Sequence, residues 1–175
     1  MRYVDLLKTT VLLSAASATA LAVITVVQAN ALDDSLLVLI AAGWWVAAAL
    51  IGAWLGRRLE ASPSIARALR EAQSTTMLPE LNVGRMLLSR LWPLLLAALV
   101  SAIFSFFLPQ IAAIAAGFMV IWALSWRHQD RAVTAIEDRD GVTFFVASGS
   151  PIQPIKLVRT PGLRRDSGPE PWKAT

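Results

Sequence analysis

The stretch Ser35–Gly56, SLLVLIAAGWWVAAALIGAWLG, decides the fold class of this chain. It contains no charged residue, and its length matches the roughly 20 apolar residues that a helix needs to cross the hydrocarbon core of a bilayer. Apolar residues occupy every face of the helix that it would form, whereas a helix of a soluble bundle carries one apolar stripe. The stretch therefore predicts a transmembrane helix.

Three further runs have the same character, and they lie at about residues 9–29, 86–108 and 110–126. Apolar residues make up 56% of the 175-residue chain and charged residues 16%, whereas about 25% of the residues in a typical soluble domain are charged. Four helices of a soluble bundle would need charged outer faces, which these runs lack. We therefore expect an all-α membrane protein in which residues 1–126 form four transmembrane helices, paired as two hairpins.

The positive charges predict the orientation of these spans. All 16 Lys and Arg residues lie in residues 1–8, in the connection 57–90 or after residue 126, while the connection 30–34 has two Asp residues and no cation. Because cytoplasmic segments of membrane proteins are enriched in Lys and Arg, we expect both termini and the loop 57–85 to face the cytoplasm. The location that this predicts is the inner membrane of the cell.

A cleaved secretory signal peptide is an alternative for the first span. Arg2 and Lys8 precede the apolar run, and Ala29–Ala31 has the small-x-small form of a cleavage site. The apolar run is longer than the 7–15 residues typical of a signal peptide, which favours a retained span. Cleavage would leave three spans in the same orientation.

Small residues in two spans are predicted to pack the helices together, because small side chains let helices approach closely in lipid. The second span has Gly52 and Gly56 in GxxxG spacing, preceded by Ala48, and the first span has Ser14 and Ser17 in a run without bulky side chains. We expect the first span to be the most buried helix and to pack against the Gly52–Gly56 face. Homodimerisation is the alternative use of the GxxxG spacing.

The second and fourth spans share a short pattern. The residues IAAGWWV at 40–46 align with IAAGFMV at 114–120. An internal duplication would make the two hairpins a parallel repeat, which is a known arrangement in membrane proteins. Coincidence in a sequence rich in Ala and Leu explains the match equally well.

The loop 57–85 is predicted to contain a short amphipathic helix. Ser62 and Pro63 are typical of an N-cap and a first helical residue, and Ile65 and Leu69 fall on one face of the helix. A basic amphipathic helix beside a membrane lies in the interface and binds anionic lipid headgroups; the alternative is a surface helix packed on the tail. The residues expected to contact headgroups are Arg57, Arg58, Arg67 and Arg70.

The tail at 127–160 is rich in β-branched and aromatic residues, and it predicts a small cytoplasmic β-hairpin or meander. Asp140-Gly141 is a typical hairpin turn. So few residues cannot bury a core alone, so the tail must lean on the membrane face, the loop 57–85, a second copy or another protein. Residues 161–175 are expected to be disordered. The predicted strands are 132–136, 142–146 and 155–158.

The composition excludes several kinds of chemistry. The chain has no Cys and one His, which rules out thiolate chemistry and multi-His metal sites. The apolar runs have no charge in their middle, whereas proton-coupled transporters place ionisable groups inside the bilayer. No phosphate-binding glycine loop or nucleophile elbow is present. We therefore expect no enzyme activity, no catalytic residue, no metal and no cofactor.

The function expected is that of an accessory or scaffold protein, with residues 132–160 docking a protein partner or a second copy. The alternative is an oligomeric small transporter or channel subunit with a pore lined by hydroxyl groups. Nucleic acid is not expected as a partner despite the pI of about 10.3, because the membrane topology already accounts for the cations. The hydroxyl groups that such a pore could use belong to Ser14, Ser17, Thr19, Ser101 and Ser105.

Overall fold

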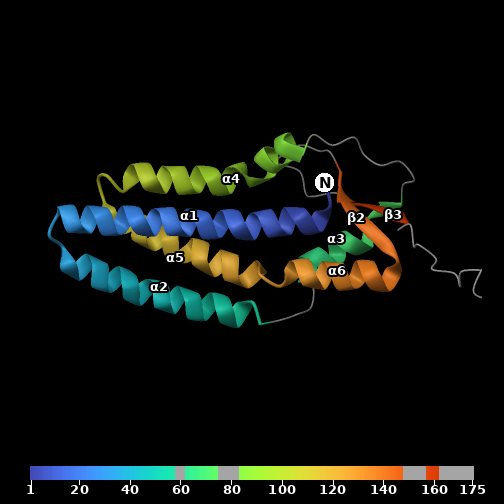
Figure 1. The fold of residues 1–175 in the computed structure, drawn as a ribbon, viewed down its shortest axis with the longest axis horizontal. Coiled ribbons are helices and arrows are strands. Elements are labelled where there is room, and N and C mark those ends of the chain that lie inside the picture. Colours follow the sequence, from blue (N-terminus) through green and yellow to red (C-terminus); the bar gives the residue numbers. More distant parts are fainter. Residues whose placement is uncertain (58–61, 75–82, 148–156, 162–175) are drawn as a thin grey trace, which may run out of the picture.

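A computed structural model of the chain describes residues 1–57, 62–74, 83–147 and 157–161. Four long helices lie side by side, and a small unit of helices and strands sits at one end of them (Figure 1). The long helices are α1 (Tyr3–Ala31), α2 (Ser35–Leu55), α4 (Val83–Phe104) and α5 (Pro109–Trp126).

Three helical runs of the described chain are long and apolar enough to cross a membrane, where the sequence predicts four. They are α1, α2 and the run Pro109–Asp140, which begins with α5. The helix α4 (22 residues) is the counterpart of the span predicted at 86–108, but it is not among these three, and its apolar stretch among the described residues is Arg90–Phe104. The helix ends at Phe104 because the chain turns there toward Pro109.

The packing of the long helices centres on α5 rather than on α1. Ala112 and Ala116 of α5 are fully buried and pack against Leu21 of α1. On its other side, α5 receives the glycine face of α2, where a Cβ placed on Gly52 would lie 2.9 Å from the Cβ of Leu124. The prediction that the first span packs against this glycine face is therefore wrong, because α5 occupies that place.

The small residues predicted to pack helices are buried, with one exception. Ala48, Gly52 and Gly56 line the side of α2 that is buried, and a Cβ on Gly56 would overlap the carbonyl oxygen of Leu124. Ser14 is fully buried and donates to the Thr10 carbonyl oxygen of its own helix, at 2.8 Å. Ser17 is only half-buried.

The two similar stretches, 40–46 and 114–120, lie against each other, because α2 and α5 run in the same direction toward the small unit (Figure 1). The indole nitrogen of Trp44 donates to the Ile114 carbonyl oxygen at 3.2 Å, and its ring meets Phe118 edge to face, with ring centroids 5.6 Å apart. Trp44 also covers Gly117, whereas nothing lies within 4 Å of a Cβ placed on Gly43. The equivalent glycines thus have different surroundings.

The small unit at the end of the helices contains α3 (Pro63–Arg70) and α6 (Gln129–Asp140) together with a three-stranded sheet. The sheet has the order β1-β3-β2, in which β2 and β3 are antiparallel and β1 is parallel to β3. Met1 and Arg2 pair with the free edge of β2, since Arg2 bridges to Phe145 and the Val146 amide donates to the Met1 carbonyl oxygen at 3.1 Å. The strands are β1 (Gln73–Ser74), β2 (Val142–Val146) and β3 (Leu157–Pro161).

The strand predicted at 132–136 is wrong, because these residues belong to α6. Ala132, Val133 and Glu137 recur at helical spacing and are buried on one face, so tertiary packing overrides the strand propensity of the β-branched residues. Gly141 adopts φ +62° and ends the helix, as glycine commonly does at this position. It therefore does not form a hairpin turn.

Of the other predictions for the tail, one strand is confirmed and one is shifted along the sequence. The strand at 142–146 is confirmed as β2, and the third strand runs from Leu157 to Pro161 instead of 155–158, with residues 155 and 156 outside the described part of the chain. The short strand β1 has no counterpart among the predicted elements. Residues 162–175 also lie outside the described residues, so the prediction of disorder there stays a prediction.

We call the unit of α3, α6, the sheet and residues Met1–Leu7 the cap, because one core joins all of them. Leu6 and Leu7 of α1 are buried together with Leu69 of α3, Val133 of α6 and Phe144 of β2. The tail thus packs against the loop 57–85 and the start of α1. Cleavage of the first span would remove the part of this core that α1 contributes. The remaining buried members are Tyr3, Val4, Ile65, Val146 and Leu157.

Replacing Gly56 by alanine should weaken the contact between α2 and α5. The added Cβ would meet the backbone carbonyl of Leu124, which cannot move aside as a side chain can. We expect Gly56→Ala to lower the free energy of unfolding by about 1–3 kcal/mol, as overpacking does in close-packed interiors. Unfolding in mixed micelles with increasing denaturing detergent, followed by circular dichroism, measures this loss.

Gly43→Ala is the matched control, because open space surrounds this glycine. Alanine favours a helix over glycine by up to about 1 kcal/mol, so this variant should be as stable as the wild type or slightly more stable. Equal stability of Gly56→Ala and Gly43→Ala would contradict the assignment of Gly56 to the α2–α5 contact.

Candidate functional site

A buried carboxylate on α6 holds the start of the chain and β2 onto this helix. Glu137 on α6 is 4% exposed, and its Oε2 accepts from Arg2 Nη2 at 2.8 Å. Its Oε1 accepts from the backbone amide of Phe144 at 2.9 Å. A buried charge is tolerated when it is paired and hydrogen-bonded, and both carboxylate oxygens meet this condition. Glu137 therefore fixes the start of the chain and β2 onto α6.

The start of the chain also has a perturbed electrostatic environment. Burial lowers the pKa of the Met1 amine, and the negative charge of Asp5 partly offsets this effect. The amine thus releases its proton more readily than an ordinary chain terminus. This fits the place of Met1 beside β2, where its carbonyl oxygen accepts from Val146.

Two polar contacts tie the connection after α2 to the junction of α5 and α6. His128 Nδ1 lies 2.9 Å from the Gly56 carbonyl oxygen, and because a carbonyl only accepts, this nitrogen carries the proton. The Ser62 amide donates to Gln129 Oε1 at 2.9 Å. His128 therefore serves here as a hydrogen-bond donor to the end of α2.

The outer face of the sheet presents a partly exposed apolar pair in the described part of the predicted docking segment 132–160. Successive side chains of a strand point to opposite faces, so Phe145 points away from the core that its neighbours Phe144 and Val146 enter. Val158 lies opposite Phe145 in the register, and both side chains are partly exposed. Phe145 and Val158 thus form a small apolar pair on the outside of the cap, which we call the outer sheet face.

The arginines predicted to contact lipid headgroups occupy different settings. Arg57, Arg67 and Arg70 are exposed, and Arg58 lies outside the described residues. The apolar face of α3 is buried in the cap through Ile65 and Leu69, so this helix packs on protein as in the alternative derived from the sequence. The role of the four arginines at headgroups stays a prediction.

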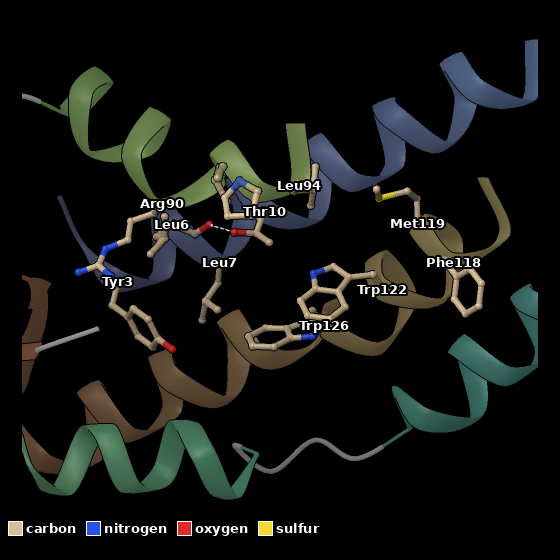
Figure 2. Close-up of a pocket in the computed structure, with 12 residues that line it drawn as sticks. Tyr3, Leu6, Leu7, Thr10, Arg90, Leu94, Phe118, Met119, Trp122 and Trp126 are labelled. Carbon is tan, nitrogen blue, oxygen red and sulfur yellow. Dashed lines mark hydrogen bonds between the residues drawn. The ribbon is translucent and has the colours of Figure 1, made fainter. Parts of the chain in front are cut away.

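A cavity of about 520 Å³ lies between α1, α4 and α5, at the end of these helices that adjoins the cap (Figure 2). Tyr3 of α1 and Arg90 of α4 lie at one end of it, and Phe118 and Met119 of α5 lie at the other. The rings of Trp122 and Trp126 stack along its floor, with centroids 5.6 Å apart and an angle of 20° between the rings. Arg90 is the charged residue in a lining that is otherwise mainly apolar.

The sequence interpretation missed both Arg90 and the cavity. A signal was present in Pro93, which lies inside α4, since a proline within a helix removes one backbone hydrogen bond and kinks the helix. A kinked helix cannot pack evenly along a straight neighbour. The Arg2–Glu137 pair had no such signal, because 135 positions separate its members.

The hydroxyl groups considered for a pore are engaged within the protomer where their hydrogen bonds are described. Thr19 donates to the Ala15 carbonyl oxygen of its own helix at 3.0 Å. Ser105 is fully buried, donates to the Ala102 carbonyl oxygen and accepts from the Gln28 amide at 3.1 Å. In the described ranges, no group of three or more His, Cys, Asp or Glu side chains is placed to hold a metal ion.

Removing the Glu137 carboxylate should loosen the cap. Glu137→Ala leaves the Phe144 amide buried without its acceptor, and an unsatisfied buried donor costs about 1–3 kcal/mol. Glu137→Gln keeps one acceptor oxygen for Phe144 but turns its NH2 donor toward the Arg2 guanidinium; because Arg2 is half-exposed and can turn to solvent, the loss should be smaller than that of Glu137→Ala. Hydrogen exchange of the Phe144 amide reports both effects, with the fastest exchange in Glu137→Ala.

Asp138→Ala is the control for this series, because Asp138 is the exposed neighbour of Glu137 on the same helix. It should leave the exchange rate of the Phe144 amide unchanged. If Glu137→Ala and Asp138→Ala exchange at the same rate, the carboxylate does not hold β2.

Comparison with known proteins gives no further guide to this cavity or to the cap. The residues and their geometry therefore carry the functional argument. The chain matches no family model, no curated protein and no solved structure.

Proposed function

We propose that the protein is a non-enzymatic accessory or scaffold protein of the inner membrane that crosses the bilayer four times, with α4 as the crossing that joins the three candidate spans α1, α2 and α5 into two hairpins. In this proposal the cap and both termini lie in the cytoplasm, which is supported by the positive charges, since cytoplasmic segments of membrane proteins are enriched in Lys and Arg. The observation that supports this proposal best is the core shared by α1, α3, α6 and the sheet. It makes the cap a fixed extension of the membrane helices.

The length of α1 supports the same view. With 29 residues, the helix is about 43 Å long, while the hydrocarbon core of a bilayer is about 30 Å thick. The surplus at its first turns is buried in the cap through Leu6 and Leu7. A partner bound to the cap would thereby be held at a fixed height and orientation above the membrane, as a scaffold requires.

The outer sheet face is the docking surface in this proposal. Phe145 and Val158 present a partly exposed apolar pair within the segment 132–160, and aromatic and apolar residues are enriched at the core of protein interfaces. We assign the surface to a protein partner, with a second copy of this chain as the outcome to be distinguished. Anionic lipid headgroups remain the proposed contacts of Arg57, Arg58, Arg67 and Arg70.

The oligomeric transporter is the weaker candidate. A pore in an oligomer needs polar groups that face the neighbouring copies, but Ser14 and Ser105 are fully buried within one protomer. The Ser14 hydroxyl donates to a carbonyl oxygen of its own helix, and the Ser105 hydroxyl, just after α4, donates to the Ala102 carbonyl oxygen of α4. Both groups thus have a structural use that leaves them unavailable to a pore.

Single cysteines test the proposed orientation directly, because the chain contains no Cys. Asn30 and Asp138 are both exposed and lie at opposite ends of the helices. In intact cells, a membrane-impermeant maleimide should label Asn30→Cys and should label Asp138→Cys only after lysis. Labelling of Asp138→Cys in intact cells would indicate the opposite orientation, with the cap outside the cytoplasm, and would contradict the proposal.

Changes at the outer sheet face test the docking surface. The double variant Phe145→Ser, Val158→Ser keeps the backbone pairing of β2 and β3 and removes the apolar pair. When the full chain is extracted from its own membranes in mild detergent, native mass spectrometry should show a bound protein on the wild type and none on the variant. Asp138→Ala, on the exposed side of α6, should retain it.

The mass of the bound protein identifies the occupant. A mass equal to this chain indicates a second copy, and any other mass indicates a different partner. A bound protein retained equally by the double variant would overturn the assignment of this face.

A further inference from the structure

We propose that the cavity between α1, α4 and α5 binds an anionic phospholipid, with the phosphate beside Arg90 and one acyl chain inside the cavity. This site lies apart from the outer sheet face, and it does not depend on the docking function. It also differs from the general attraction of headgroups to exposed arginines, because it combines one cation with an apolar chamber.

The two ends of the cavity have opposite character. Arg90 and the phenol of Tyr3 lie at one end, and Leu94, Phe118 and Met119 surround the other. The Thr10 hydroxyl in between is already engaged, since it donates to the Leu6 carbonyl oxygen at 2.8 Å. A ligand that fits this lining has a charged head and an apolar tail, which is the form of a lipid.

The positive charge of Arg90 at one end of the cavity favours a ligand with an anionic head group. A guanidinium group binds phosphate through two parallel hydrogen bonds, and this geometry makes arginine a preferred residue for phosphate recognition. Arg90 is half-buried at the edge of the apolar part of α4. In such a place a cation is only partly solvated, so pairing with a phosphate is stronger than at a fully exposed site.

The position of Arg90 along the helix places it at headgroup level. Arg90 is the last charged residue of α4 and is followed by the uncharged stretch Leu91–Phe104; Trp92, two residues on, has 43% of its surface exposed. Tryptophan is enriched at the boundary between membrane and water. The guanidinium group therefore lies where lipid phosphates lie, and the cavity extends from there into the acyl region of the leaflet next to the cap.

A lipid can reach the cavity from the side. Trp122 lines the cavity and is also 48% exposed on the surface of α5. Together with Trp126 it forms a flat, stacked wall on which an acyl chain can lie. The volume of about 520 Å³ falls within the range of about 300–1,000 Å³ that is typical of small-molecule sites.

Native mass spectrometry of the full chain in detergent tests the proposal. Phosphatidylglycerol and phosphatidylcholine with the same acyl chains are titrated separately, and the first binding event is compared. The wild type should bind one phosphatidylglycerol at least about tenfold more tightly than phosphatidylcholine, as expected for a charge-assisted contact. Arg90→Gln should lose this preference, and Arg90→Lys should keep part of it because the charge remains.

Arg131→Gln is the matched control, because Arg131 is an exposed arginine of α6, in the cap beside the same end of the membrane helices, and it does not line the cavity. It should leave the preference for phosphatidylglycerol intact. Equal losses in Arg90→Gln and Arg131→Gln would mean that headgroups are attracted by overall charge, and this would overturn a specific site. Melting temperature and elution volume show whether each variant is folded.

A further arm separates a lipid from a free anion. Inorganic phosphate at millimolar concentration should not displace phosphatidylglycerol, because it lacks the acyl chain. Leu94→Trp, which fills the apolar end of the cavity, should weaken binding of both lipids. If phosphate competes and Leu94→Trp has no effect, the site binds only an anion and the acyl-chain assignment is wrong.

Discussion

The burial of the first turns of α1 in the cap is the contact on which the rest of the structure depends. Leu6 and Leu7 pack with residues from the loop, from α6 and from the sheet. A sheet of three short strands is too small to form a stable core alone, and the start of a membrane helix supplies the missing apolar surface. The buried Glu137 then fixes the positions of the chain start and of β2 on α6, because one of its oxygens accepts from Arg2 and the other from the Phe144 amide.

Close backbone approach provides the second constraint, within the helical part. Small side chains let α5 contact both α1 and α2, through Ala112 and Ala116 on one side and the Gly52–Gly56 face on the other. In lipid, association of helices depends on such packing. The fourth helix, α4, contains Pro93 and lines the cavity at that level. Tight packing around α5 and a chamber beside α4 thus arise from residues of different shape.

The sequence predicted those features that depend on local pattern. The uncharged run Ser35–Gly56 indicates a membrane helix because its composition alone sets the cost of exposing it to water or lipid. The strand predicted at 132–136 failed because β propensity is weak where a helical face can be buried, and Val133 is buried on that face. The partner of the glycine face and the Arg2–Glu137 pair depend on contacts between distant parts of the chain, which composition and spacing do not encode.

The pairing of Met1 and Arg2 with β2 has a consequence for the order in which the protein assembles. Met1 and Arg2 are synthesised before the strand with which they pair, since β2 follows all of the membrane helices, and the side-chain partner of Arg2, Glu137 on α6, lies 135 positions later. Contacts of such long separation form slowly. The first helix is therefore complete before its leading residues can pair, and closure of the cap around Met1 and Arg2 has to wait until α6 and β2 have been made.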